Sequence, residues 1–176
     1  MTAPSLPRYT NEASTEYLSH LDDIYFEQDR LEGRDEQGAA LLKQQQAYAK
    51  AHPPIAIYRV ATEGSQTRNG GTIQQASSRL VFTLDGRQRR AAQKGDHVVY
   101  ADGSTARIVT GAGKGNTHIA LVGSRLSSGD EIIDTPQRTL IIILREGVPR
   151  AVDFLPAIGP VEGRHLRLVK RQETAR

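Results

Sequence analysis

The five histidines are the residues of this chain best suited to bind a metal ion or to act in acid–base catalysis. No two of them have the short spacing, such as His-x-x-x-His, that places two metal ligands on one helix face. The histidines are His20, His52, His97, His118 and His165. We therefore expect no catalytic residue and no metal site. Any exception would involve His97 and His118, because both lie in the strand-rich part of the chain.

Cysteine is absent from the chain, which excludes disulfides, thiolate metal sites and cysteine nucleophiles. The sequence has no Gly-x-Ser-x-Gly turn for a serine nucleophile. The run from Gly111 to Gly115 is glycine-rich like a phosphate-binding loop, but it lacks the Gly-Lys-Ser/Thr ending. We interpret it as a hairpin loop. A hydrolase with a site spread over several loops is the enzymatic alternative, and it would need convergent carboxylates or a His–Ser pair.

A local basic cluster would favour binding of nucleic acid or another polyanion. Its members are Arg87, Arg89, Arg90 and Lys94, in a chain whose formal net charge is +3. Sites for single-stranded nucleic acid usually add aromatic side chains on which bases stack. None lies between Tyr58 and Phe82 or between Phe82 and Tyr100. We therefore do not expect nucleic acid as the partner, and a small basic β domain that binds a polyanion remains the alternative function.

Residues 14–51 have the pattern of two helices. Apolar side chains recur there at helical spacing: Tyr17, Leu18, Leu21, Ile24 and Tyr25. Asp35 is placed to cap the second helix, and His52-Pro53-Pro54 ends it because proline cannot continue a helix. We expect residues 1–54 to form an N-terminal helical hairpin extension, in which residues 1–11 are disordered.

From Ile55 onward, short alternating strands and frequent turns predict a mainly β domain. Asp85-Gly86 and Asp102-Gly103 indicate tight hairpin turns, since Asp-Gly tolerates positive φ. Leu140–Leu144 and Val148–Phe154 predict a further hairpin. We expect a compact β-hairpin domain over residues 55–155 and a basic C-terminal tail over residues 156–176. Within the domain, residues 63–71 are expected to be a polar loop.

One short motif stands out in this β region. The run Arg90-Ala91-Ala92-Gln93-Lys94-Gly95-Asp96 places small residues ahead of a Gly-Asp pair. A looser copy, residues 124–130, ends in Gly129-Asp130, 34 positions later. Glycine adopts positive φ easily, and an aspartate after it can accept backbone N–H groups. We interpret the two copies as similar turns stacked in one domain.

These residues resemble the signature of the PAAR-repeat family, Pro-Ala-Ala-Arg followed one residue later by Gly-Asp. The setting is also similar, because Gly70-Gly71 and a strand precede the signature and Gly129-Asp130 follows it. The resemblance implies a cone-like PAAR-type domain that caps the trimeric VgrG spike of a type VI secretion system, a contractile injection device. It implies structural roles for Gly70, Gly71, Asp85, Gly86, Ala91, Ala92, Gly95, Asp96, Gly129 and Asp130.

The sequence departs from this family at the positions of its usual zinc site. Where the family commonly has Thr-His-Gly-Gly, this chain has Arg68-Asn69-Gly70-Gly71. Where it commonly has Cys-Pro-x-His-Gly, this chain has Tyr100-Ala101-Asp102-Gly103. The signature proline and arginine are replaced by Arg90 and Gln93. We therefore expect no zinc and no other cofactor, and an apex that is held by packing and turn hydrogen bonds.

The resemblance also implies a partner and a route. We expect one chain per VgrG trimer, with N-terminal helices that could dock an effector or adaptor. Residues 1–11 lack the apolar core of a signal peptide, and the apolar run Leu140–Leu144 is too short to span a membrane. We expect a non-enzymatic protein without a membrane partner, made in the cytoplasm without a signal peptide and secreted or injected through the type VI apparatus.

Overall fold

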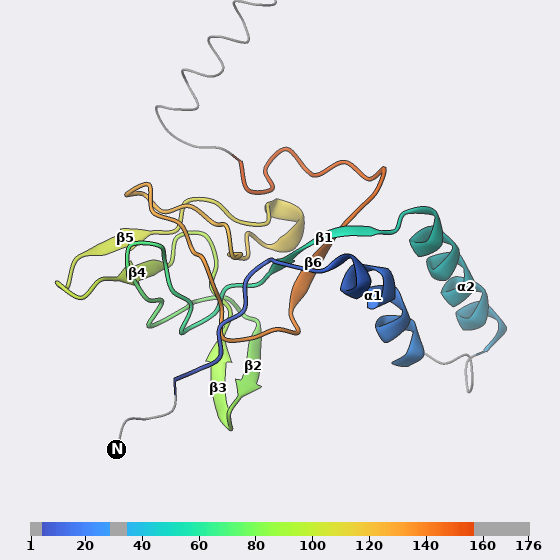
Figure 1. Ribbon diagram of the computed structural model, residues 1–176, viewed down its shortest axis with the longest axis horizontal. Coiled ribbons are helices and arrows are strands. Elements are labelled where there is room, and N and C mark those ends of the chain that lie inside the picture. Colours follow the sequence, from blue (N-terminus) through green and yellow to red (C-terminus); the bar gives the residue numbers. More distant parts are fainter. Residues whose placement is uncertain (1–4, 29–34, 157–176) are drawn as a thin grey trace, which may run out of the picture.

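The computed structural model describes residues 5–28 and 35–156 of the 176-residue chain (Figure 1). These residues combine two α-helices with short strands that pair antiparallel, two by two. The elements are α1 (Thr15–Gln28), α2 (Glu36–Ala51), β1 (Pro54–Arg59), β2 (Val81–Leu84), β3 (Arg87–Arg90), β4 (His97–Val99), β5 (Thr105–Arg107), a 3-10 turn η1 (Lys114–Asn116) and β6 (Ile141–Arg145). The basic tail expected from the sequence lies outside the described residues from position 157 onward.

Both helices begin at side-chain caps. Ser14 Oγ accepts a hydrogen bond from the N–H of Tyr17 (3.0 Å), and Asp35 Oδ1 accepts one from the N–H of Gly38 (2.7 Å). Such bonds satisfy N–H groups that have no partner within the first helical turn. α2 ends at Ala51, before the two prolines. The two helices and the cap at Asp35 are confirmed.

β1 pairs with β6, so the first and last strands of the β domain lie side by side (Figure 1). Ile57 is the partner of Ile143 in this ladder and is only 1% exposed. The hairpin expected between Leu140–Leu144 and Val148–Phe154 is therefore wrong, and residues 148–154 contain no strand. Burial of the apolar β1 side chains outweighs the loop-closure entropy, which grows only slowly with loop length.

Three segments of the β domain make the same backbone hydrogen bonds, which relates them by a pseudo-threefold axis. They are residues 60–73 (repeat 1), 91–108 (repeat 2) and 119–132 (repeat 3). The N–H of Ala61 donates to the C=O of Ala120 (2.9 Å), that of Ala120 to Ala92 (2.8 Å), and that of Ala92 to Ala61 (2.9 Å). The three bonds close a triangle around the axis.

A tight turn follows the alanine in each repeat. Its glycine has φ of +95° at Gly64, +100° at Gly95 and +105° at Gly123, a region that glycine enters without steric cost. The N–H of each glycine donates to the C=O of an equivalent isoleucine at 2.8 Å; these are Ile73, Ile108 and Ile132 respectively. The repeats therefore share their turn as well as their axial triangle.

The core of the β domain consists of equivalent side chains from the three repeats. One set is the alanine triangle, and the second is Ile73, Ile108 and Ile132. The third is Thr67, Val98 and Leu126, each three residues after the turn glycine of its repeat. All nine residues are buried: Thr67 is 3% exposed and the other eight are 0% exposed. Small residues at the triangle let three backbones approach, and branched residues fill the space beyond them.

The repeat has a different register from the one expected. Asp96 Oδ2, Ser65 Oγ and Ser124 Oγ each accept a hydrogen bond from the N–H three residues earlier (3.0, 2.9 and 2.9 Å). Gly95-Asp96 is thus equivalent to Gly64-Ser65 and Gly123-Ser124. Gly129-Asp130 lies in another turn, so the interpretation of two similar Gly-Asp turns is wrong. Residues 63–71, expected to be a loop, form most of repeat 1.

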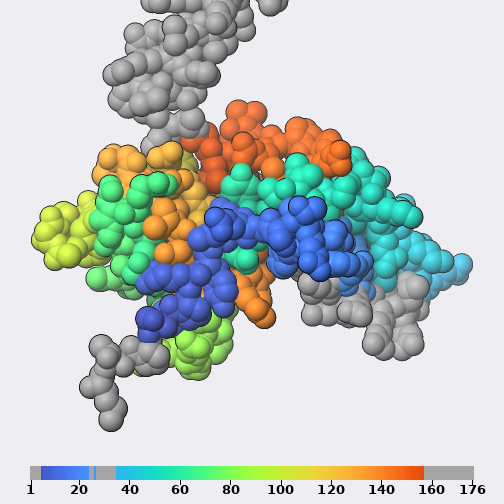
Figure 2. All heavy atoms as spheres, in the orientation of Figure 1, coloured from blue at the N-terminus to red at the C-terminus, as the bar shows by residue number. Residues whose placement is uncertain are grey.

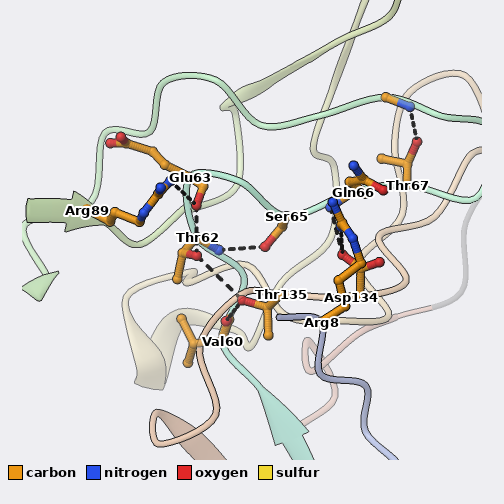
Figure 3. A network of polar contacts seen from close by, with 11 residues as sticks. Arg8, Val60, Thr62, Glu63, Ser65, Gln66, Thr67, Arg89, Asp134 and Thr135 are labelled. Atoms are coloured by element: carbon orange, nitrogen blue, oxygen red, sulfur yellow. Dashed lines mark hydrogen bonds and ion pairs between the residues drawn. The ribbon is translucent and has the colours of Figure 1, made fainter. Parts of the chain in front are cut away.

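The N-terminal segment is part of the β domain (Figure 3). Tyr9 and Thr135 exchange two N–H···O=C bonds (2.9 and 3.0 Å), and Arg8 Nη1 lies 2.8 Å from Asp134 Oδ1. Asn11 accepts a bond from the N–H of Arg59 (2.8 Å). The expected disorder is therefore wrong for residues 8–11. Their partners are distant in sequence, so local composition does not reveal them.

α1 packs against β1 and is held by one ion pair. Arg145 of β6 makes two bonds to the Asp22 carboxylate (2.6 and 2.9 Å), and both side chains are less than 20% exposed. The same guanidinium donates to the C=O of His52, at the end of α2 (3.1 Å). Arg145 thus ties both helices to the β domain, and Figure 2 shows them together on one side of it.

Candidate functional site

Each repeat ends in a hairpin turn, and the three turns meet at one end of the axis, which we call the tip end. They span residues 67–71, 100–104 and 126–130. The N–H of the turn glycine donates to the first residue of each turn; the glycines are Gly70, Gly103 and Gly129, at 3.1, 2.9 and 2.9 Å. Gly129-Asp130 is therefore equivalent to Gly70-Gly71.

One carboxylate joins the three turns at the tip end. The hydroxyl of Tyr100, from repeat 2, donates to Asp130 Oδ2, from repeat 3 (2.6 Å). The N–H of Asn69, from repeat 1, donates to Asp130 Oδ1 (3.2 Å). Asp130 is only 3% exposed. A buried carboxylate with partners on all three repeats can hold the turns together.

The electrostatics of this cluster follow from its burial. Burial and the hydrogen bond to Asp130 raise the pKa of the Tyr100 phenol above its ordinary value. Burial by itself would raise the pKa of Asp130. The hydroxyls of Thr67 and Tyr100 and the backbone N–H groups of Glu131 and Asn69 oppose this and hold that pKa below its ordinary value. Asp130 is therefore a stable anion, which suits a structural role better than proton transfer.

Gly71 is held closely inside the same cluster. A Cβ atom at this position would collide with the side chains of Val98 and Tyr100 and lie 3.0 Å from Thr67 Oγ1. Glycine is therefore required by close approach, whereas Gly70 needs its positive φ of +88°. Together the two glycines let the repeat 1 turn close over the tip.

Three arms leave the opposite end of the axis, which we call the arm end: β1–β6, β2–β3 and the loop 111–118. The N–H of Val60 donates to Leu140 and that of Ala91 to Leu80, both at 2.9 Å, so the first two arms start alike. Exposed apolar side chains lie on these arms: Ile55 (51%), Leu80 (39%) and Val81 (39%). The three tip turns expose no large apolar side chain.

The remaining expected site residues lie along the axis and on the arms. Ala91 and Ala92 are 0% exposed, and Ala92 belongs to the triangle. Asp96 accepts bonds from the N–H of Gln93 (3.0 Å) and from the N–H and hydroxyl of Ser77 (3.0 and 2.5 Å). Asp85 and Gly86 form the exposed turn between β2 and β3. These positions are not gathered in one site.

His97 and His118 are both exposed. No group of three or more His, Asp or Glu residues that could hold a metal ion occurs within residues 5–28 and 35–156. Where the family that the sequence resembles has its zinc ligands, the tip end carries Asn69, Tyr100 and Asp102. An amide and a phenol bonded to Asp130 do not fit as zinc ligands, and the single carboxylate of Asp102 does not make a zinc site.

Sequence reasoning missed repeat 1 and the link from Tyr100 to Asp130. A signal for the repeat is present, because Ala61, Gly64-Ser65 and Gly70 recur 59 positions later as Ala120, Gly123-Ser124 and Gly129. No such signal exists for the tyrosine, because the residues at the same place in the other two turns are Thr67 and Leu126, and its partner comes from another repeat.

The described part of the chain has no helix with the length and apolarity needed to cross a bilayer. Comparisons of this chain with protein families, with curated proteins and with solved structures find no match.

Proposed function

We propose that this protein is a structural spike-tip protein that caps the trimeric VgrG spike of a type VI secretion system. The observation that carries the proposal is the closed triangle of backbone hydrogen bonds between Ala61, Ala92 and Ala120. A single chain has no symmetry of its own, so three equivalent repeats are what allow it to match the end of a trimer. The resemblance of residues 90–96 to the PAAR signature supports the same partner.

The arm end is the face that we assign to the spike. Its arms carry the exposed apolar residues Ile55, Leu80 and Val81, whereas the tip turns expose no large apolar side chain. Open strand edges on the arms can continue the strands of a β-structured partner. The tip end then points away from the spike, stiffened by the Tyr100–Asp130 hydrogen bond in place of zinc. In this assignment the protein has no catalytic role and needs no cofactor.

Light scattering after size-exclusion chromatography tests the proposal, with the chain mixed with the VgrG trimer of its source organism. We expect one chain per trimer. Val81→Asp, which puts a charge on the β2 arm, should abolish the complex. Ser127→Asp, at the tip end, should leave it intact. If no VgrG of that organism forms a complex, or if the tip variant is the one that fails, the assignment is wrong.

Polyanion binding is less well supported by the contacts of the basic cluster. Arg90 Nη1 donates to the C=O of Ser78 (2.6 Å), and Arg89 Nη1 lies 3.4 Å from the C=O of Glu63. Two of the three arginines are thus engaged within the domain. A titration with mixed oligonucleotides should give no steeply salt-dependent binding, which a polyanion site would require.

A further inference from the structure

The pseudo-threefold arrangement creates three equivalent seams along the β domain. In each seam, the segment leaving one repeat lies against the turn of the next. Seam A joins residues 133–136 to repeat 1, seam B joins residues 74–77 to repeat 2, and seam C joins residues 109–112 to repeat 3. A hydrogen bond crosses each seam: Gln66 N–H to Asp134 (3.1 Å), Ser77 N–H to Asp96 (3.0 Å) and Arg125 N–H to Thr110 (2.8 Å).

Seam A is filled by the N-terminal segment. Tyr9 pairs with the backbone of Thr135 through two hydrogen bonds. Leu6 Cδ1 lies 3.5 Å from where a Cβ on Gly64 would stand. An extended segment thus adds to the exit strand and lays a leucine over the turn glycine (Figure 3 shows the neighbouring Arg8 and Asp134).

Seam C is filled in the same way by the other end of the described chain. The N–H of Leu155 donates to the C=O of Gly111 (2.8 Å), and Gly111 is the equivalent of Thr135. Leu155 Cδ1 lies 3.4 Å from where a Cβ on Gly123 would stand. Two segments that are unrelated in sequence therefore cover two equivalent seams with one contact pattern.

Seam B has no such cover among the described residues. Nothing lies within 4 Å of where a Cβ on Gly95 would stand. Ala76, the equivalent of Thr135 and Gly111, makes no backbone hydrogen bond to any described residue. Ser77 and Gln75 are exposed, whereas their equivalents Pro136 and Asp134 in seam A are buried.

A second observation, independent of the first, is that one side chain is too short to fill seam B. The residue three positions before the triangle alanine of each repeat lies in a seam beside a neighbouring repeat. It is Arg89 in seam A, Tyr58 in seam C and Thr117 in seam B. Arg89 Nη1 reaches to 3.2 Å from the Gly64 Cβ position, and Tyr58 packs edge-on against Phe154 (5.1 Å between ring centroids). Beside Thr117 a hollow of ≈ 720 Å³ remains, lined by Ser77, Ser78, Arg79, Leu80, Gln93 and Ile119.

We propose that seam B is a binding groove for an extended segment of a partner protein. The segment pairs with the free backbone groups of Ala76 and places an aliphatic side chain beside Gly95, as Leu6 and Leu155 do in the other seams. Lys94, which is exposed and directly precedes Gly95, favours an acidic residue next to that anchor. The occupant is a partner because the described terminal segments already fill seams A and C. This inference does not depend on the spike assignment.

A labelled peptide tests the groove in the full-length protein. The probe is a fluorescein-labelled peptide with the sequence of residues 5–12, which carries the Leu6 contact pattern, and with Arg8→Glu to supply the acidic residue near that anchor. We expect saturable binding by fluorescence polarisation. Thr117→Arg, which imitates Arg89 and fills the hollow, should weaken it about tenfold or more, a loss of about 1.4 kcal/mol. Thr105→Arg, an exposed β5 position with the same charge change, is the control and should bind as the wild type does.

Hydrogen exchange supplies the second measurement. The amide of Ala76 should exchange rapidly in the free protein and slow down when the peptide binds, with no change at Tyr9 or Leu155. Absence of saturable binding would overturn the proposal. So would binding that survives Thr117→Arg, because the peptide would then be replacing its own copy in seam A. An Ala76 amide that is already protected in the free protein would mean that its backbone is not available to a partner, and would also overturn the proposal.

Discussion

The hydroxyl of Tyr100 offers a sharp test of how the tip end is held. Tyr100→Phe keeps the ring that packs beside Gly71 and removes the hydroxyl, with its 2.6 Å hydrogen bond to Asp130. A hydrogen bond to a charged group contributes about 1.5–3 kcal/mol. Asp130 keeps backbone N–H donors from Asn69 and Glu131. We therefore expect a loss near the lower limit, about 1.5–2 kcal/mol, which lowers Tm by roughly 3–8 °C for a chain of this length.

Thermal and urea unfolding at neutral pH measure this effect. Tyr48→Phe is the matched control, since Tyr48 is 50% exposed on α2 and lies away from the tip end. It should melt as the wild type does. A Tm of Tyr100→Phe equal to that of the control would refute the reasoning, because the tip would then be held by packing alone. A double-mutant cycle with Asp130→Asn should recover most of the loss as a coupling between the two side chains.

The same contact makes stability depend on acid. The pKa of Asp130 is lower in the folded protein than in the unfolded chain, so its contribution is present above about pH 4 and is lost as pH falls through the folded pKa. Tyr100→Phe removes one cause of the low pKa. The wild type should therefore lose more stability than the variant between neutral pH and acid, and parallel curves would contradict the assignment.

Three further substitutions address the axis, the turns and the helices. Gly95→Val should cost about 1–3 kcal/mol from backbone strain alone, since its surroundings are open; a wild-type melting curve would show that the turn tolerates a side chain. Ala92→Leu should overpack the triangle and lower the free energy of unfolding in urea by about 1–3 kcal/mol, while Ala101→Leu, at an exposed turn, should leave it unchanged. Arg145→Ala should leave Asp22 unpaired and cost about 1–3 kcal/mol, with faster amide exchange in α1 as its signature; unchanged exchange would mean that the ion pair does not hold the helix.

The features that were predicted correctly are those that depend on neighbouring residues. The cap at Asp35 and the helix end before Pro53 act within one helical turn, so the local pattern contains them. The turn at Asp85-Gly86 is also local, because two residues with positive φ join β2 and β3. For such elements the short-range chemistry decides the backbone, and tertiary contacts only select its packing.

The errors all concern partners that are far apart along the chain. β6 was assigned to the following segment, but its partner is β1, and the N-terminal segment was expected to be disordered, but Tyr9 pairs with Thr135. Short strands carry too few residues to specify a partner by their own pattern. The predicted register of the repeat was wrong for the same reason, because Gly95-Asp96 and Gly129-Asp130 are alike in sequence but lie in different turns.

By itself, the sequence determined the two helices, the tight turns, the absence of thiol chemistry and the small residues that a crowded axis requires. Only the tertiary structure decided that three repeats close around Ala61, Ala92 and Ala120, and that Tyr100 meets Asp130 at the tip. It also decided that two seams are filled, whereas no residue among those described fills the seam at Gly95. The physical reason is that local conformation depends on a few adjacent dihedral angles, whereas closure depends on which distant surfaces bury each other best.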